Sequence, residues 1–164
     1  MAAACNLSPR FCSLLMAFHF ALSTSFQLND PDWYFWFPLY ATACIVNLVN
    51  GMKTEKNMRK MAQFALWLGV LLFFKVIIEH FVNGIAGFWS FDMRERVVRE
   101  KFGSGLVIGS MFLQLETLAH PNHPNKQQKT RVAKHVNLGM PVLVGISYGL
   151  SLFFFVFQLR EMKF

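Results

Sequence analysis

The chain has 164 residues, enough for one domain, and its composition excludes it from the ordinary soluble proteins. Hydrophobic residues make up 54% of the sequence, 19 residues are Phe, and only 15% are charged. The net charge of +7 does not point to nucleic acid, because the basic residues lie in short connectors between apolar runs, as they do in membrane proteins. Three cysteines without metal-type or redox spacing, Cys5, Cys12 and Cys44, are predicted to be unpaired.

The first apolar run covers about residues 11–28, which is close to the lower length limit for a membrane-spanning helix. A cleavable signal peptide is the alternative interpretation. Arg10 precedes the run, and Ala21-Leu22-Ser23 has the small residues of a cleavage site.

An acidic corner follows the first run. Asp30 before Pro31 is typical of a helix N-cap, and Asp32 places negative charge at the positive end of the helix dipole. Aromatic residues of the kind enriched at the headgroup level come next: Trp33, Trp36 and Tyr40. We therefore expect a tight turn between two membrane helices, with an aromatic belt. The alternative is a polar mouth in which Asn29, Asp30 and Asp32 hold a cation or the basic group of a partner.

The corner also carries a resemblance to a known family. The residues Gln27, Asn29, Asp30, Pro31 and Asp32, followed by Trp36 and Tyr40, resemble the signature of the transmembrane protein 220 family. Ser104-Gly105-Leu106-Val107 resembles a second, shorter block of that family, and the order of the apolar runs is similar over most of the chain. The resemblance implies a small multi-pass membrane protein of unestablished activity, whose first helix is retained. The aromatic residues 33–37 and the long loop around His120 depart from the family pattern.

The second run, about 34–49, contains Pro38 in its first turns, and a basic connector leads to the third run, about 61–81. Lys75, Glu79 and Asn83 recur there at four-residue steps and share one helix face, with His80 beside Glu79. A lone charge at mid-bilayer costs on the order of 3 kcal/mol. We expect an ion pair near the end of the run, where a lysine can reach the interface. A proton or ion relay is the alternative.

The segment 84–102 mixes glycines, aromatics and alternating charges, and it predicts a short amphipathic helix on the membrane surface. The fourth run, about 103–119, contains the pair Gly105 and Gly109, a spacing that lets two helices approach closely. Glu116, four residues before His120, forms a second polar pair near its end.

The loop 120–134 turns from histidine and proline to basic residues. His120, His123 and His135 do not make a zinc site by number or ligand type, and we predict no metal. The fifth run, about 136–159, carries a second glycine pair, Gly145 and Gly149.

The fold predicted from these runs is an all-α integral membrane protein, with one domain of five transmembrane helices (alternatively four) and an interfacial segment. Charge places the N-terminus in the cytoplasm and the C-terminus outside or in a lumen of the plasma membrane or an endomembrane. Nine basic residues then lie inside and six outside. Glycosylation of Asn6, in the sequon Asn6-Leu7-Ser8, would reverse this orientation.

No catalytic motif or phosphate loop stands out, so we predict a non-enzymatic protein without a cofactor. The expected function is assembly: a helix unit that packs through its glycine pairs against other membrane proteins or copies of itself, with the lipid bilayer as its surroundings. The alternative function is a pathway for a small solute, an ion or protons that uses Lys75, Glu79, His80 and Glu116.

Overall fold

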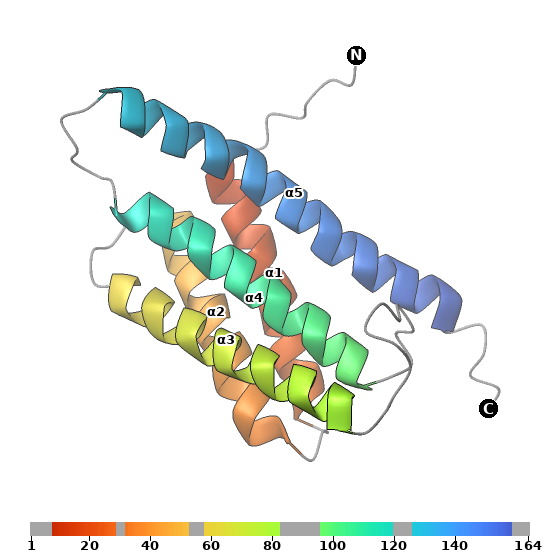
Figure 1. Ribbon diagram of the computed structural model, residues 1–164. Helices are drawn as coiled ribbons and strands as arrows, with labels where there is room; N and C mark the ends of the chain where they lie inside the picture. The colour runs from red at the N-terminus through yellow and green to blue at the C-terminus, as the bar shows by residue number, and fades with distance from the viewer. Residues whose placement is uncertain (1–7, 29–31, 53–57, 83–95, 120–125, 159–164) are drawn as a thin grey trace.

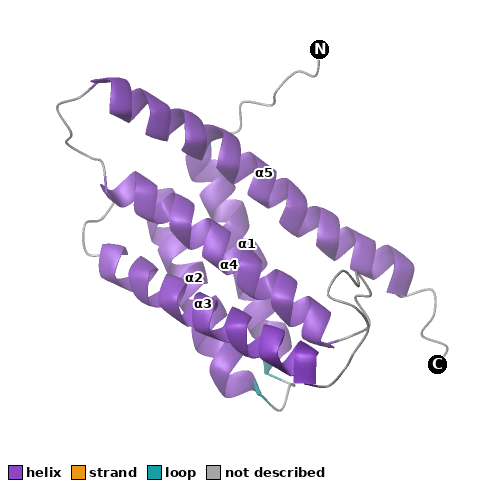
Figure 2. Ribbon diagram, in the orientation of Figure 1, coloured by secondary structure: helices purple, strands orange, loops and turns teal. Residues whose placement is uncertain are grey.

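The computed structural model describes residues 8–28, 32–52, 58–82, 96–119 and 126–158, and all regular structure in these ranges is α-helical (Figures 1 and 2). The helices are α1 (Pro9–Gln27), α2 (Trp33–Met52), α3 (Met58–Val82), α4 (Arg96–Ala119) and α5 (Lys126–Gln158). Their order and number agree with the five apolar runs of the sequence. Pro9 opens α1 at a position where no backbone N–H is required.

Two helix starts differ from the sequence prediction. α4 begins at Arg96, so residues 96–102, which the sequence prediction assigned to a separate surface segment, form its first turns. The remainder of the predicted surface helix, 84–95, lies outside the described residues. α5 begins at Lys126 and not near 136. Neither stretch contains a proline or glycine, and both are rich in Lys, Arg, Gln or Glu, which favour helices. Polar residues at the end of an apolar run therefore show where a helix leaves the apolar environment. They do not show where the helix ends.

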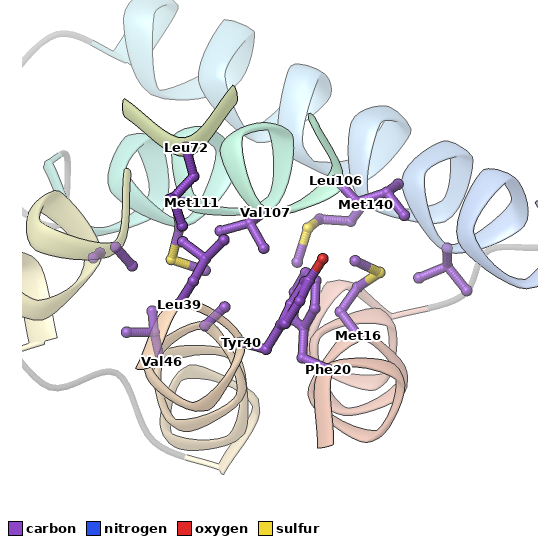
Figure 3. Packing of buried hydrophobic residues seen from close by; sticks show 14 of the residues in the cluster. Met16, Phe20, Leu39, Tyr40, Val46, Leu72, Leu106, Val107, Met111 and Met140 are labelled. Atoms are coloured by element: carbon purple, nitrogen blue, oxygen red, sulfur yellow. The ribbon is translucent and has the colours of Figure 1, made fainter. Parts of the chain in front are cut away.

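The helices form two antiparallel hairpins, α1–α2 and α3–α4, and α5 packs against α1 and α4 (Figure 1). Figure 3 shows α4 and α5 packed across from α1 and α2. Between them, Met16 and Phe20 of α1 and Tyr40 of α2 face Leu106 of α4 and Met140 of α5 (Figure 3).

Three helices contain segments long and apolar enough to cross a membrane: Trp33–Met52, Met58–Glu79 and Lys134–Phe153. α1 and α4 do not reach this level of hydropathy, because polar side chains are spread through them. The outer surface is strongly apolar. On α3 it carries an exposed row at heptad spacing: Phe64, Trp67, Leu71, Phe74, Ile78 and Phe81. Such a surface suits hydrocarbon chains rather than water.

Candidate functional site

A buried polar network, absent from the sequence-based predictions, joins α1, α2 and α4. Its members are Ser13, Asn47, Asn50, Ser110 and Gln114, all less than 9% exposed. In the apolar interior of a membrane protein, polar side chains at this depth are stable only when they bond to one another.

Asn47 is the centre of the network. Its Nδ2 donates to Ser110 Oγ at 2.9 Å and to the carbonyl of Ala43 at 2.9 Å. Its Oδ1 accepts from Ser110 Oγ at 3.1 Å and from Gln114 Nε2 at 2.9 Å, and it lies 3.5 Å from Ser13 Oγ. One amide therefore ties three helices together.

Gln114 extends the network in two directions. Its Nε2 also donates to Ser13 Oγ, and its Oε1 accepts from Asn50 Nδ2 at 3.0 Å. Asn50 Oδ1 is buried and has no hydrogen-bond partner among the described residues. The network is thus closed around Asn47 and incomplete at Asn50.

A sequence signal for this network exists. Asn47 interrupts the second apolar run and Asn50 directly follows it, and Ser110 and Gln114 lie four residues apart in the fourth. Amides and hydroxyls inside spans, on one face of each helix, indicate interhelical hydrogen bonds. The signal does not say which helices pair, and the structure supplies that information.

The aromatic residues of the corner divide between surface and core. Trp33, Tyr34 and Phe35 are exposed, but Trp36 is fully buried and Tyr40 is 4% exposed. These two therefore do not lie on the lipid-facing surface where the belt interpretation put them. Tyr40 stacks between Phe20 and Trp36, with ring centroids 6.3 Å and 6.2 Å apart. Gln27 is half-buried, and Asn29, Asp30 and Pro31 lie outside the described residues.

The hydroxyl of Tyr40 lies directly against the backbone of α4 at Gly103. A Cβ at Gly103 would overlap the Tyr40 Oη and lie 3.1 Å from its Cζ. Gly103 is therefore the point where α2 and α4 approach closely. Ser104, next along α4, is buried and bonds back to the carbonyl of Glu100 at 2.7 Å. Glu100 is itself only 3% exposed, and the sequence analysis did not single it out.

Lys75 links the two polar sites that the sequence analysis treated separately. Its Nζ lies 3.1 Å from Asp32 Oδ2 of the corner and 3.8 Å from Glu79 Oε2, one turn away on α3. It also lies 5.7 Å from the centroid of the Phe35 ring, within range of a cation–π contact. The predicted neighbours His80 and Asn83 cannot be added, because the His80 side chain and Asn83 lie outside the described part. Lys75 thus fastens the end of α3 to the α1–α2 corner.

The Lys75–Asp32 pair should contribute little to stability. Lys75→Met is expected to lower the free energy of unfolding by about 0.5–1 kcal/mol, because 37% of the lysine side chain is exposed to solvent screening. Denaturant titration in mild detergent measures this value, and Lys60→Met, at an exposed site on the same helix, is the control. A coupling energy above about 2 kcal/mol in the cycle with Asp32→Asn would contradict the expectation of a screened pair.

The acidic residues proposed for a pathway do not come together. A Cβ at Gly69 would lie 3.2 Å from Ile108 Cγ1, which aligns these two positions on the antiparallel helices α3 and α4. Glu79 is ten residues beyond Gly69, and Glu116 is eight residues beyond Ile108 in the opposite direction. At 1.5 Å per residue, the two carboxylates are separated by about 27 Å along the bundle. Lys75 and Glu79 belong to one end of the bundle, and Glu116 belongs to the other.

The predicted glycine pairs behave differently from each other. Gly109 packs inside the bundle, where an added Cβ would lie 3.1 Å from Leu143 Cδ1 of α5. A Cβ at Gly105, Gly145 or Gly149 would meet nothing within 4 Å, and all three residues are exposed. The α5 pair therefore presents its small-residue face outward.

The described residues contain no group of three or more His, Cys, Asp or Glu side chains that could hold a metal ion. His120 and His123, two of the three histidines weighed for zinc, are outside the described ranges.

Comparison with known protein families decides the identity of the chain. A model of the family described as "Transmembrane family 220, helix" matches residues 19–116, more than half of the sequence. The chain belongs to transmembrane family 220. No curated protein and no solved structure matched it.

Membership of family 220 confirms the resemblance noted in the sequence and makes this chain an integral membrane protein, with the lipid bilayer as its surroundings. The matched region runs from the middle of α1 to near the end of α4. It includes the corner, Lys75 and four of the five members of the buried network. α5 and its outward glycine face lie outside it. The family match indicates no molecular activity.

Proposed function

We propose that this family 220 protein is a non-enzymatic assembly component, which holds a helix of another membrane protein, or of a second copy, against the outer face of α5. The observation that carries the proposal is the open glycine pair. Gly145 and Gly149 are exposed, one turn apart, with no atom within 4 Å of either added Cβ. Small residues at this spacing allow two helix backbones to approach closely in a bilayer.

Side chains around the glycine pair shape this face for packing. Val142, Ile146, Leu152 and Phe153, near the glycine pair in the sequence, are between 49% and 63% exposed. They form ridges beside a shallow floor of two glycines. Since lipid chains are as apolar as these residues, association here would be driven by close packing.

The bundle behind α5 supports a holding role. Ser13, Asn47, Ser110 and Gln114 satisfy one another across three helices. Such a network favours one arrangement of the helices, which suits a rigid unit. The separation of Glu79 from Glu116 gives no support to a pathway that uses both.

The proposed orientation in the membrane has five crossings, with the N-terminus in the cytoplasm and the C-terminus outside or in a lumen. It follows from the excess of basic residues in the connectors at one end of the bundle. The plasma membrane and the endomembranes are both compatible with it.

Loss of the open glycine pair should abolish assembly without unfolding the protein. Tagged full-length protein is solubilised from membranes in mild detergent, and its partners are quantified by mass spectrometry. We expect Gly145→Leu with Gly149→Leu to reduce the bound partner, or second copy, by about tenfold or more, since bulky residues keep helices apart. The melting temperature should be unchanged, because nothing within 4 Å opposes the new side chains.

Gly105→Leu is the matched control for that experiment. Gly105 is also exposed with nothing within 4 Å, but it belongs to α4. It should leave the partner bound. Recovery of no partner from wild-type protein, or equal loss from both variants, would overturn the proposed function.

A further inference from the structure

The net charge of the chain is concentrated at one end of the bundle. The fold places the start of α1, the end of α2, the start of α3, the end of α4 and the start of α5 at the same end (Figure 1). We call this the basic end. By sequence, these helix ends and the connectors that join them contain nine basic residues: Arg10, Lys53, Lys56, Arg59, Lys60, Lys126, Lys129, Arg131 and Lys134. They contain only two acidic ones, Glu55 and Glu116.

The rest of the sequence carries no net charge. Its seven basic residues are Lys75, Arg94, Arg96, Arg99, Lys101, Arg160 and Lys163. They are balanced by seven acidic ones, Asp30, Asp32, Glu79, Asp92, Glu95, Glu100 and Glu161. The whole net charge of +7 therefore belongs to the basic end.

Described residues of the basic end come from three helices and are exposed. Arg10 is in the first turn of α1, Arg59 and Lys60 are in the first turn of α3, and Lys134 is on α5. The charge is therefore presented by separate elements around one face of the bundle and not by a single helix terminus.

The start of α5 carries the basic end beyond the hydrocarbon region. The apolar part of α5 that could span a bilayer begins at Lys134, but the helix begins at Lys126. These eight further residues extend the helix by about 12 Å, roughly the depth of a headgroup layer. They carry Lys126, Lys129 and Arg131 and no acidic residue.

We propose that the basic end binds anionic phospholipid headgroups of the bilayer in which the chain sits, with phosphorylated inositol lipids as the preferred class. Four to eight Lys or Arg residues directly beside a membrane-spanning helix attract such lipids. Each of these residues that lies near the membrane surface adds to the electrostatic attraction. A headgroup with several phosphates can contact cations on more of the neighbouring helices at once than a headgroup with one phosphate can. The bilayer is the source of the ligand, because the candidate span of α5 begins at Lys134, and the exposed Arg10, Arg59 and Lys60 lie in the first turns of α1 and α3 at the same end. This inference does not depend on assembly through α5.

The test uses full-length protein, delipidated in mild detergent and titrated with phosphatidylinositol 4,5-bisphosphate or with phosphatidylcholine. Native mass spectrometry measures the bound lipid. We expect the inositol lipid to bind about tenfold or more tightly than phosphatidylcholine. Its binding should weaken as salt rises from 0.1 to 0.5 M, because salt screens these charges.

Two variants with equal loss of charge locate the site. In the first, Lys126, Lys129, Arg131 and Lys134 are all replaced by Gln, and we expect affinity for the inositol lipid to fall about tenfold or more. In the control, Arg94, Arg96, Arg99 and Lys101 are replaced by Gln, and affinity should stay within about twofold. The four basic-end residues exchanged for Arg or Lys of the same charge should bind like wild type. This variant separates charge from a folding defect.

Several outcomes would overturn the proposal. These are equal binding of both lipids by wild-type protein, or equal loss in both Gln variants. Displacement of the lipid by equimolar inositol trisphosphate would mean that a free phosphate compound is the ligand. Displacement by single-stranded RNA at lower concentration would point to nucleic acid, which the distribution of the basic residues does not favour.

Discussion

Gly103→Ala is expected to lower the free energy of unfolding by about 2–3 kcal/mol, which is a large effect for one methyl group. The new Cβ would overlap the hydroxyl of Tyr40. That hydroxyl cannot move aside easily, since the ring is 4% exposed and stacked between Phe20 and Trp36. α2 and α4 would have to separate at their close approach. Denaturant titration in mild detergent measures the loss.

Two further variants make this prediction specific. Gly105→Ala adds the same methyl group two residues away, where nothing lies within 4 Å, and it should change stability by less than about 0.5 kcal/mol. Tyr40→Phe combined with Gly103→Ala removes the overlapping oxygen, and the pair should be more stable than Gly103→Ala alone. Additive losses in the double variant would show that Tyr40 and Gly103 do not meet.

Replacing Asn47 by leucine is expected to cost about 3 kcal/mol or more. The change removes the central amide of the network and leaves Ser13, Ser110 and Gln114 buried with fewer partners. Individual hydrogen bonds between membrane helices contribute only about 0.6 kcal/mol on average. The larger cost comes from buried donors and acceptors left without partners, at roughly 1–3 kcal/mol each.

Asn50→Leu is the comparison for this prediction. Asn50 is also a buried asparagine on α2, but it makes one hydrogen bond, to Gln114, and its Oδ1 makes none. The expected loss is about 1 kcal/mol. The same denaturant titration measures both variants. If Asn50→Leu proved as costly as Asn47→Leu, the network would not be centred on Asn47.

The amino-acid sequence was sufficient to predict the class of fold and the family. Blocks of apolar residues separated by short polar connectors predicted a membrane protein with five helical runs, and five helices are present. α1 ends at Gln27 and α2 begins at Trp33, on either side of the predicted corner. These features are local: they depend on the hydropathy of a stretch and on turn-forming residues, both of which can be read without knowing what the stretch contacts.

The partners of the polar residues could not be predicted in the same way. Lys75 was expected to pair with Glu79, one turn away, but its closer partner is Asp32, 43 residues earlier. Asn47 pairs with Ser110 and Gln114 across the α2–α4 interface. A pair between helices depends on which helices are neighbours and on their relative level along the bundle. Connector lengths do not determine either.

The inward face of each helix was also decided only by the tertiary structure. In water, one apolar stripe marks the side of a helix that faces the core. In a bilayer the outer side is apolar too. α3 therefore exposes Trp67 and Phe74 outside while Ala65 and Val76 are buried inside, and no stripe distinguishes the two sides. For the same reason the glycine pairs looked alike in the sequence, although Gly109 packs within the bundle and Gly145 faces outward. The sequence by itself determined that the helices lie in a bilayer and how many there are. Packing between the helices determined which face of each helix is buried inside the bundle.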